Sequence, residues 1–237
     1  MNVAFVIVAG GKGTRMGADR PKQYLELHEK PVLIETVANV AYQLQNDDDV
    51  VVVVPPGDLD FVRMLIREFF VHRARSPRIQ VTGGGETRAE SVRKGLDAVP
   101  GRAEFVAVHD GVRPFVNASL ISRLLGAAGA GARSVIPALP ADDSIRLREG
   151  KIFRSVPRRD VFRVQTPQLF EASLLRTAYR RYAECPDPAL TDDASIVSEL
   201  CGVAPTIVEG LRENIKITTP TDLRLAQLIA EDFAPAG

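Results

Sequence analysis

The chain has 237 residues, 45% of them hydrophobic, and its 30 basic and 30 acidic side chains give a formal net charge of +0. This size suits a single α/β domain spanning 1–237, and the neutral charge is not typical of proteins that bind nucleic acid over a broad surface. Because the N-terminus does not resemble a signal peptide and no apolar run reaches membrane-spanning length, we expect a cytoplasmic protein with no nucleic-acid or membrane partner.

Apolar runs and amphipathic stretches alternate through the first part of the chain. The runs predicted as buried strands are 3–8, 50–54, 79–82, 105–108 and 134–136. The stretches predicted as helices are 31–45, 59–70, 89–99 and 119–132. This alternation favours a mostly parallel sheet with helices on both faces. The loops 10–15, 83–88 and 109–114 then lie at the carboxyl ends of strands, where such sheets bind ligands.

The stretch 142–163 interrupts this alternation. Short charged segments around Glu149 and Gly150 predict a β-hairpin. The hairpin has too few apolar residues for its own core, so we expect an arm that packs on a second subunit and makes a homodimer. The remaining predicted elements are helices at 171–184, 192–201 and 221–233 and strands at 206–209 and 215–217. Thr221 is the expected N-cap of the last helix.

The loop after the first strand has the composition of a phosphate-binding site. Gly10, Gly11 and Gly13 have no side chains, so backbone N–H groups can approach phosphate oxygens closely. Arg15 and Lys22 add positive charge nearby. The glycine spacing fits neither a P-loop nor the dinucleotide fingerprint, which disfavours a dinucleotide-dependent dehydrogenase. A tight turn without a ligand is the alternative for the glycines alone.

Several motifs together carry a family resemblance. VAGGKGTRM at 8–16, followed by Pro21 and Lys22, resembles nucleotidyltransferases that join a nucleoside triphosphate to a sugar phosphate. GGETRAESV at 84–92, VHDGVRP at 108–114, QTPQ at 165–168, TDDAS at 191–195 and NIKIT at 214–218 follow in order. The ordered set resembles the 2-C-methyl-D-erythritol 4-phosphate cytidylyltransferase family over nearly the whole chain.

This resemblance implies a fold and a reaction. The fold is an α/β, Rossmann-like nucleotidyltransferase fold with a twisted, mostly parallel sheet, helices on both faces and a projecting β-arm. The reaction transfers CMP from CTP to 2-C-methyl-D-erythritol 4-phosphate and releases pyrophosphate, in the non-mevalonate isoprenoid pathway. The attacking group is already a phosphate anion, so positioned cations, rather than a general base, are the expected catalytic groups.

The resemblance also implies roles for single residues. Arg15, Lys22 and Lys216 would be the catalytic cations, and Asp110 would ligate Mg²⁺ or another divalent cation. The residues implied for nucleotide binding are Ala9, Gly10, Gly11, Gly13, Gly85, Glu86 and Ser91. The residues implied for binding the methylerythritol phosphate are Arg113, Ser144, Arg158, Thr166 and Thr191. Among these, Arg158 lies in the arm and would act across the dimer interface.

Some of these residues have simpler alternatives. Asp110 before a glycine also fits a turn, and Lys216 between two isoleucines also fits an exposed strand position. Arg158 and its neighbour Arg159 also fit a solvated basic pair. Asp192 and Asp193 fit the start of a helix, where acidic residues are favourable, so we assign no metal to them.

Two other functions stay open on the sequence alone. A ribitol-5-phosphate cytidylyltransferase would share the nucleotide half and differ near the arm, Thr166 and Thr191. A non-catalytic nucleotide-binding module would have no need for the four groups Arg15, Lys22, Asp110 and Lys216 together.

Overall fold

A computed structural model describes residues 1–11, 20–45, 47–70 and 77–233. Its main sheet contains β1 (Val3–Val8), β4 (Asp49–Val54), β5 (Arg78–Gly83), β6 (Phe105–Asp110), β7 (Ser134–Pro140), β10 (Phe162–Val164), β11 (Gln168–Glu171) and β12 (Thr206–Glu209). The order across the sheet is β5-β4-β1-β6-β11-β7-β10, and β12 pairs with β7. β10 and β11 run antiparallel to their neighbours, while the other pairings are parallel. The mostly parallel sheet is therefore confirmed.

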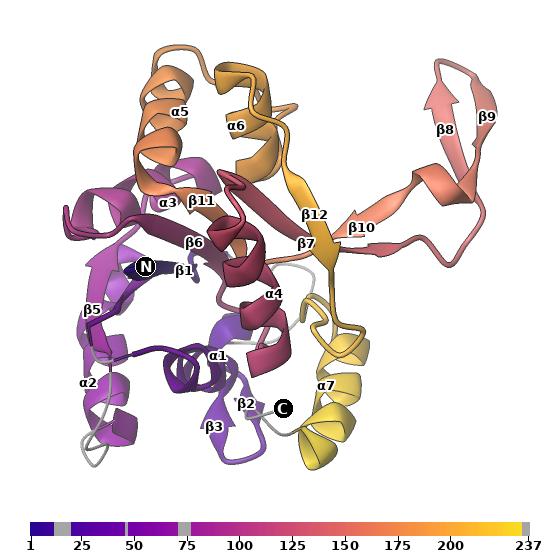
Figure 1. Ribbon diagram of the computed structural model, residues 1–237. Coiled ribbons are helices and arrows are strands. Elements are labelled where there is room, and N and C mark those ends of the chain that lie inside the picture. Colours follow the sequence, from indigo (N-terminus) through magenta and orange to yellow (C-terminus); the bar gives the residue numbers. More distant parts are fainter. Residues whose placement is uncertain (12–19, 46, 71–76, 234–237) are drawn as a thin grey trace.

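Helices cover both faces of the sheet (Figure 1). One face packs on α1 (Val32–Tyr42), α2 (Leu59–Phe70) and α4 (Ala118–Gly129). The other face packs on α3 (Arg88–Ala98), α5 (Ala172–Glu184) and α6 (Asp193–Cys201). Side chains alternate along a strand, so Phe5 and Ile7 point to the first layer and Ala4 and Val6 to the second. This two-sided burial explains why the strands are continuous apolar runs.

Shorter elements and the last helix complete the body. The short elements are η2 (Lys22–Tyr24), β2 (Glu26–Leu27), β3 (Lys30–Pro31), η3 (Pro56–Asp58) and η4 (Arg158–Asp160). The last helix, α7 (Pro220–Asp232), packs on a separate small core that includes Phe115, Ile217 and Ala226. None of the helices in the described part of the chain is long and apolar enough to cross a membrane.

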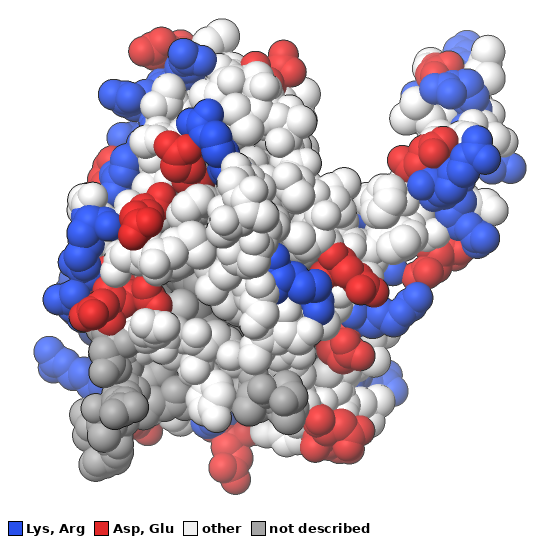
Figure 2. Space-filling model, viewed as in Figure 1, with Lys and Arg blue, Asp and Glu red and all other residues white. Residues whose placement is uncertain are grey.

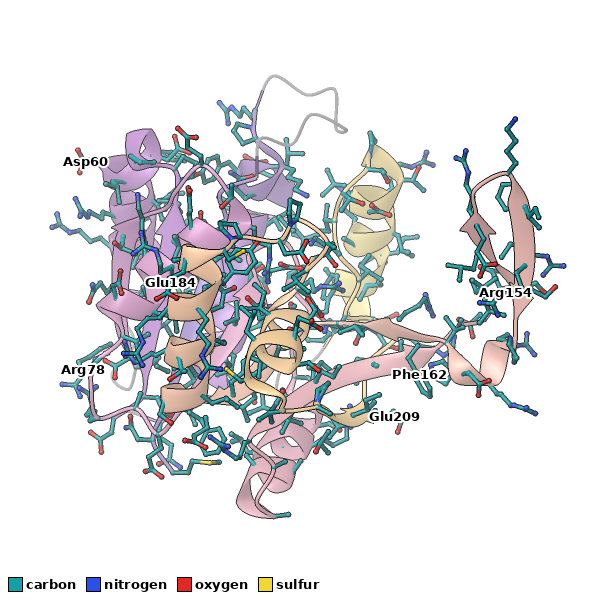
Figure 3. The ribbon with its side chains drawn as sticks, turned by 90° about the horizontal axis from the view of Figure 1, so that it is seen from above. Asp60, Arg78, Arg154, Phe162, Glu184 and Glu209 are labelled. Carbon is teal, nitrogen blue, oxygen red and sulfur yellow. The ribbon has the colours of Figure 1, made fainter. Side chains whose placement is uncertain are left out.

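The predicted β-hairpin is present. β8 (Ile145–Glu149) and β9 (Ile152–Val156) pair antiparallel, and Gly150 at φ 63° makes the turn, a conformation that favours glycine. The hairpin projects well clear of the body, as the views from the front and from above both show (Figures 1 and 3). Large apolar side chains are exposed on it and on the neighbouring β10: Leu147, Ile152, Phe153, Phe162 and Val164.

The C-terminal segment differs from the prediction in two respects. Residues 215–217 form no strand; the segment is held to the body by one backbone bond, from Ile217 N–H to the Val112 carbonyl. The N-cap of α7 is Thr219 and not Thr221, because the Thr219 hydroxyl accepts the Asp222 N–H while the Asp222 carboxylate accepts the Thr219 N–H. Pro220 is the first helical residue, a position that proline favours.

Candidate active site

A cleft of about 790 Å³ opens at the carboxyl ends of β1, β4, β5 and β6. The chain passes from β1 to β4 and β5 on one side and then crosses back to β6 on the other side of β1, so a crevice forms where the strand order reverses. The described residues that line the cleft are Val8, Ala9, Gly10, Gly11, Lys22, Gln23, Pro55, Pro56, Gly84, Gly85, Glu86, Thr87, Arg88, Ser91, Asp110, Val112 and Lys216. The structure therefore brings together most of the predicted nucleotide-binding residues with Lys22, Asp110 and Lys216.

One wall of the cleft is a turn braced by the start of α3. The Ser91 hydroxyl accepts the Gly85 N–H at 3.1 Å and donates to the Thr87 carbonyl at 2.9 Å. The Glu90 carboxylate accepts the Glu86 N–H at 2.7 Å. A Cβ on Gly84 would lie 2.7 Å from the Ser91 hydroxyl oxygen, so this close approach needs glycine. Ser91 is thus buried beneath the turn and fixes its shape.

Asp110 gathers three cations at the opposite wall. Its carboxylate lies 2.9 Å from Lys216 Nζ, 3.4 Å from Arg113 Nε and 3.7 Å from Arg88 Nε. Burial opposes the charge of this carboxyl, but Lys216, Arg88 and Arg113 outweigh burial and hold the pKa of Asp110 well below its ordinary value. Asp110 therefore stays ionised, and segments far apart in the sequence meet at one point.

Arg88 links this cluster to the second helical layer. Its guanidinium makes two hydrogen bonds to the fully buried Asp193 carboxylate, at 2.7 and 3.1 Å. Burial opposes the charge, but Asp193, and then Asp110, raise the pKa of Arg88 above its ordinary value. The Tyr179 hydroxyl also donates to Asp193. The three cations with Asp110 and Asp193 leave one uncompensated positive charge, which favours an anionic ligand.

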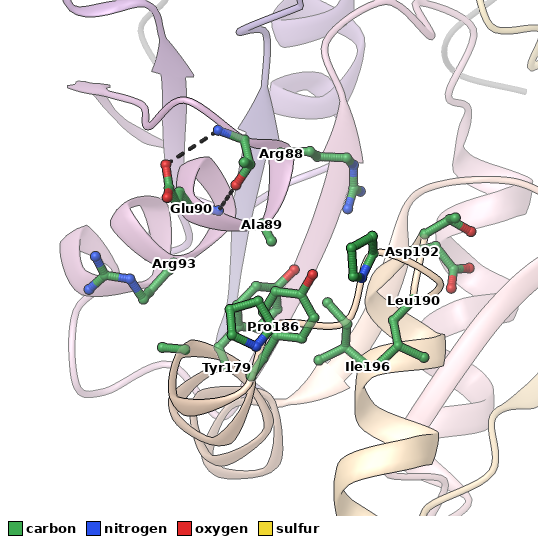
Figure 4. A pocket seen from close by; sticks show the side chains of 14 residues that line it. Arg88, Ala89, Glu90, Arg93, Tyr179, Pro186, Leu190, Asp192 and Ile196 are labelled. Carbon is green, nitrogen blue, oxygen red and sulfur yellow. Dashed lines mark hydrogen bonds between the residues drawn. The ribbon is translucent and has the colours of Figure 1, made fainter.

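A second pocket of about 530 Å³ adjoins the cleft and shares Thr87 and Arg88 with it. Figure 4 shows α3 residues on one side, and Tyr179, Pro186, Leu190 and Ile196 around the others. The predicted substrate residue Thr191 lines this second pocket and not the main cleft. Asp192 caps α6 through the Ser195 N–H, so the helix-start interpretation of the acidic pair is confirmed.

Two other predicted substrate residues lie deeper. The Arg113 guanidinium is held between Asp110 and the Asn214 carbonyl, which it reaches at 2.8 Å. Thr166 is buried, and its hydroxyl contacts the Asp110 N–H at 3.1 Å and His109 Nδ1 at 2.9 Å. The structure therefore places Thr166 behind the cleft wall, where its hydroxyl is engaged within the protein. Direct contact of either residue with a substrate stays a prediction.

Ser144 and Arg158 lie on the arm, away from the cleft of their own chain. Arg158 is exposed and donates to the Asp142 carbonyl at 2.9 Å. Figure 2 shows that basic side chains gather on the arm, whereas the adjoining face of the body is mostly uncharged. Their implied contact with a substrate requires the arm of one chain to reach the cleft of another.

Arg15 and Gly13 lie outside the described residues. The other predicted phosphate-binding groups are placed: Ala9 N–H donates to the Val53 carbonyl at 2.8 Å, and Gly10 and Gly11 are exposed at the cleft floor. Gly111 closes the floor from β6, where an added Cβ would lie 2.9 Å from the Ala9 Cβ. Glycine at position 111 allows this close approach, whereas an added Cβ on Gly10 or Gly11 would make only ordinary contacts, at 3.7 and 3.8 Å.

The cleft offers few protein ligands for the predicted divalent cation. Across the described ranges, no three His, Cys, Asp or Glu side chains converge as metal ligands. Asp110 offers one ionised carboxylate in the cleft. Magnesium commonly takes one or two carboxylates, with waters and substrate phosphates as its other ligands. A single carboxylate therefore fits Mg²⁺ that arrives with a triphosphate, and does not fit a metal held by protein ligands alone.

Sequence reasoning assigned no role to Arg88, His109 or Asn214. Arg88 stood inside the GGETRAESV motif, and His109 directly before Asp110. Their contacts depend on partners distant in the sequence, such as Asp193 and Thr166. A polar residue next to a predicted metal ligand was the available signal for His109.

Comparisons with known proteins show the family to which the chain belongs. The chain matches the family described as 2-C-methyl-D-erythritol 4-phosphate cytidylyltransferase over residues 3–232. It is 42% identical to the protein of that name from Phocaeicola vulgatus, over 97% of this chain and 100% of the other. The crystal structure of 4-diphosphocytidyl-2C-methyl-D-erythritol synthase from Anaerococcus prevotii superposes with a TM-score of 0.82 at 26% identity, covering 97% and 98% of the two chains. The crystal structure of the Thermus thermophilus 2-C-methyl-D-erythritol 4-phosphate cytidylyltransferase superposes with a TM-score of 0.72 at 32% sequence identity. The match covers 95% of this chain and 98% of the other.

Proposed function

The chain belongs to the 2-C-methyl-D-erythritol 4-phosphate cytidylyltransferase family and is a nucleotidyltransferase. We propose that the cleft at the ends of β1, β4, β5 and β6 binds CTP and methylerythritol phosphate. The protein transfers CMP from CTP to 2-C-methyl-D-erythritol 4-phosphate, a step of isoprenoid biosynthesis. The observation that carries the site is the convergence of Lys216, Arg113 and Arg88 on Asp110, in a cleft that the glycine loops also line.

The reaction is a displacement at phosphorus. A phosphate oxygen of the acceptor forms a bond to the α-phosphorus of CTP, and the bond from that phosphorus to the bridging oxygen of the β-phosphate breaks. The electron pair leaves with pyrophosphate. Since the nucleophile is already anionic, no proton has to be removed. This suits a site whose histidine is neutral and engaged at both ring nitrogens.

The cations have the task of bringing anions together. Lys22 lies on the glycine-loop side, and Lys216 on the Asp110 side, so the cleft has cations on both walls. We propose that Lys22, Lys216 and Arg15 stabilise the charge that develops on the reacting phosphate and pyrophosphate. The Gly84–Glu86 turn with Ser91 is proposed to bind the cytosine end, and Arg113 the acceptor phosphate.

A bound Mg²⁺ would neutralise phosphate charge and orient the triphosphate. We propose Asp110 as its protein ligand, because this carboxylate stays ionised at the cleft wall. In the chain itself, Asp110 also holds Lys216 in place at 2.9 Å.

We also propose that two chains associate through the arm. The exposed Leu147, Ile152 and Phe153 support this, because an isolated two-stranded hairpin is only marginally stable in water and large exposed apolar groups mark contact surfaces. In such a dimer, Arg158 and Ser144 would bind acceptor in the partner's cleft. A cytoplasmic location stays a prediction.

Alanine substitutions at Lys22 and Lys216 test the site. Each is expected to lower kcat about 100-fold, with a much smaller change in the Kd for CTP, because the charge they stabilise develops mainly in the transition state. Stopped-flow pyrophosphate release and calorimetry measure the two quantities. Lys30→Ala is the control, since Lys30 pairs with Glu35 outside the cleft. Wild-type turnover in both cleft variants would refute this assignment.

A further inference from the structure

His109 is completely buried at the end of β6, and the proposed reaction gives it no task. Its Nε2 lies 2.9 Å from the Arg113 carbonyl oxygen, and its Nδ1 lies 2.9 Å from the Thr166 hydroxyl. We propose that His109 is a positioning residue, which through these two hydrogen bonds sets where Asp110 and Arg113 stand in the cleft. The inference deepens the proposed function and rests on it for the roles of those two side chains.

The direction of each hydrogen bond follows from the chemistry of the partners. The Arg113 carbonyl only accepts, so His109 Nε2 carries the proton. The ring is completely buried, which disfavours its charged form, so the ring is neutral and its Nδ1 accepts. The Thr166 hydroxyl therefore donates to Nδ1, and its oxygen accepts the Asp110 N–H at 3.1 Å. The direction of each of these three hydrogen bonds is thereby fixed.

These hydrogen bonds hold both ends of one tight turn. The Arg113 N–H donates to the Asp110 carbonyl at 3.0 Å, so residues 110–113 form the turn. Thr166 holds the Asp110 end, and His109 holds the Arg113 end. The two charged side chains of the turn face each other at 3.4 Å. A rotation of the turn would therefore move both charged groups relative to the substrate.

The same network reaches the segment that carries Lys216. Asn214 donates from Nδ2 to the Thr166 carbonyl at 2.8 Å, and its own carbonyl accepts from Arg113 Nη1 at 2.8 Å. Arg113 is thus held through its main chain by His109 and through its guanidinium by Asn214. An apolar residue at position 109 would fill the same space but would leave the Thr166 hydroxyl and the Arg113 carbonyl without this partner, a costly change in a buried site.

Three substitutions separate the two hydrogen bonds. His109→Phe removes both. The Asn side chain in His109→Asn places an oxygen near the position of Nδ1 and keeps the acceptor for Thr166, whereas the Gln side chain in His109→Gln places an N–H near Nε2 and keeps the donor to Arg113. Leu124→Ala, on the buried face of α4, is the control for lost stability alone, because Leu124 does not line the cleft.

The expected results are specific to each variant. His109→Phe lowers kcat about 10- to 100-fold and raises the KM for the acceptor, as loss of a supporting hydrogen-bond shell typically does. The KM for CTP at saturating Mg²⁺ rises less than the acceptor KM, because the glycine loops are not in the network and Asp110 acts on CTP only through the metal. His109→Phe also raises the Mg²⁺ concentration for half-maximal rate, because the Asp110 end of the turn loses its support through Thr166. His109→Gln recovers the acceptor KM, and His109→Asn recovers the Mg²⁺ dependence. Wild-type values of kcat and KM in His109→Phe would overturn the inference. It would also be overturned if the loss of kcat in every variant, Leu124→Ala included, simply followed the loss in the free energy of unfolding.

A spectroscopic measurement decides the inference even if the proposed function fails. The chain has 3 histidines, so ¹⁵N spectra of the imidazoles are simple, and the signal lost in His109→Asn identifies His109. At pH 7 we expect a neutral ring with the proton on Nε2, and a shifted Nδ1 signal in Thr166→Val. A proton on Nδ1, a charged ring, or no response to Thr166→Val would contradict the network. Absence of turnover by the wild-type enzyme would refute the function separately.

Discussion

Asp110 shows how a single buried carboxylate organises a site for anions. It holds Lys216 at 2.9 Å, with Arg113 and Arg88 close by, before any substrate arrives. Cations held in this way need little reorganisation when phosphate charge develops beside them, which is the main source of electrostatic catalysis. The carboxylate thus limits repulsion among the cations and keeps them at one wall of the cleft.

Asp110→Asn tests this role. We expect a higher Mg²⁺ concentration for half-maximal rate, because the protein ligand to the metal is lost. We also expect tighter binding of CTP in the absence of Mg²⁺, because Lys216 loses its anionic partner and a negative charge leaves the cleft. Mg²⁺ titrations of rate and metal-free calorimetry measure these effects. Asp97→Asn, on the exposed side of α3, is the control. An unaltered Mg²⁺ titration would argue against the metal role.

Residue roles were only partly predictable from the sequence. The family resemblance implies separate roles for Lys216 and Asp110, but nothing in their spacing indicates the contact that the structure shows between them. Gly85, Glu86 and Ser91 shared one motif and do share one turn. Thr191 lines the neighbouring pocket and Thr166 lies behind the cleft wall, and the predicted contact of each with the substrate stays a prediction. Orientation depends on long-range packing, which a motif does not encode.

At the scale of elements, the cap of α7 fixes the segment that follows Lys216. The Asp222 carboxylate accepts from the Thr218 N–H, the Thr218 hydroxyl and the Thr219 N–H, at 2.7 to 2.9 Å. Burial opposes the charge of Asp222, but these hydrogen bonds prevail and hold its pKa below the ordinary value. The C-terminal helix therefore anchors an otherwise irregular stretch.

Asp222→Asn is expected to destabilise the fold by about 1 kcal/mol at neutral pH, the usual size of a lost cap. Because the folded-state pKa is lowered, this contribution is present above the unfolded pKa of Asp, about 3.9, and disappears as the pH falls through the folded value. Urea unfolding at pH 7 and at pH 3 measures the difference between variant and wild type. The difference should shrink at the lower pH. Asp232→Asn, at the other end of α7, should show no such loss. A difference in the free energy of unfolding between Asp222→Asn and wild type that is the same at pH 7 and pH 3 would contradict this account.

The elements that periodicity identifies are those buried on two faces. The runs at 3–8 and 50–54 became β1 and β4 with shifts of at most one residue. β11 was not predicted, because four residues after a proline have too little pattern and their strand depends on pairing with β6 and β7. The expected strand at 215–217 was wrong for the converse reason: two isoleucines alternate there, but no strand among the described residues pairs with them.

At the scale of the whole molecule, the arm (142–163) makes few contacts with the rest of its own chain. It buries little against its own chain, while Phe153 remains 64% exposed. A homodimer would cover such side chains and bring Arg158 to a cleft. The proposed dimer thus accounts for both the apolar side chains and the position of the basic residues.

Phe153→Asp is expected to give a monomer, because a buried charge without a partner is costly at an apolar contact. Light scattering measures the mass of the variant. Leu228→Asp is the matched control, because Leu228 is 63% exposed on α7 but lies outside the arm. A dimeric mass for Phe153→Asp, or a monomeric mass for the wild type, would contradict the arm interface.

Mixing two inactive variants tests whether the arm completes the partner's site. Arg158→Ala alone and Lys216→Ala alone should each have little activity. After mixing and re-association, one cleft in each mixed dimer has an intact Lys216 and receives an intact Arg158, so about a quarter of wild-type activity should return. No recovery, with mixed dimers verified by mass, would place Arg158 outside the partner's cleft.

The central claim is most directly tested by pyrophosphate release from CTP and Mg²⁺, with 2-C-methyl-D-erythritol 4-phosphate or ribitol 5-phosphate as acceptor. Release with the methylerythritol phosphate, and none above background with ribitol 5-phosphate, is the result that we predict. Release with ribitol 5-phosphate alone, or with neither acceptor, would contradict the assignment.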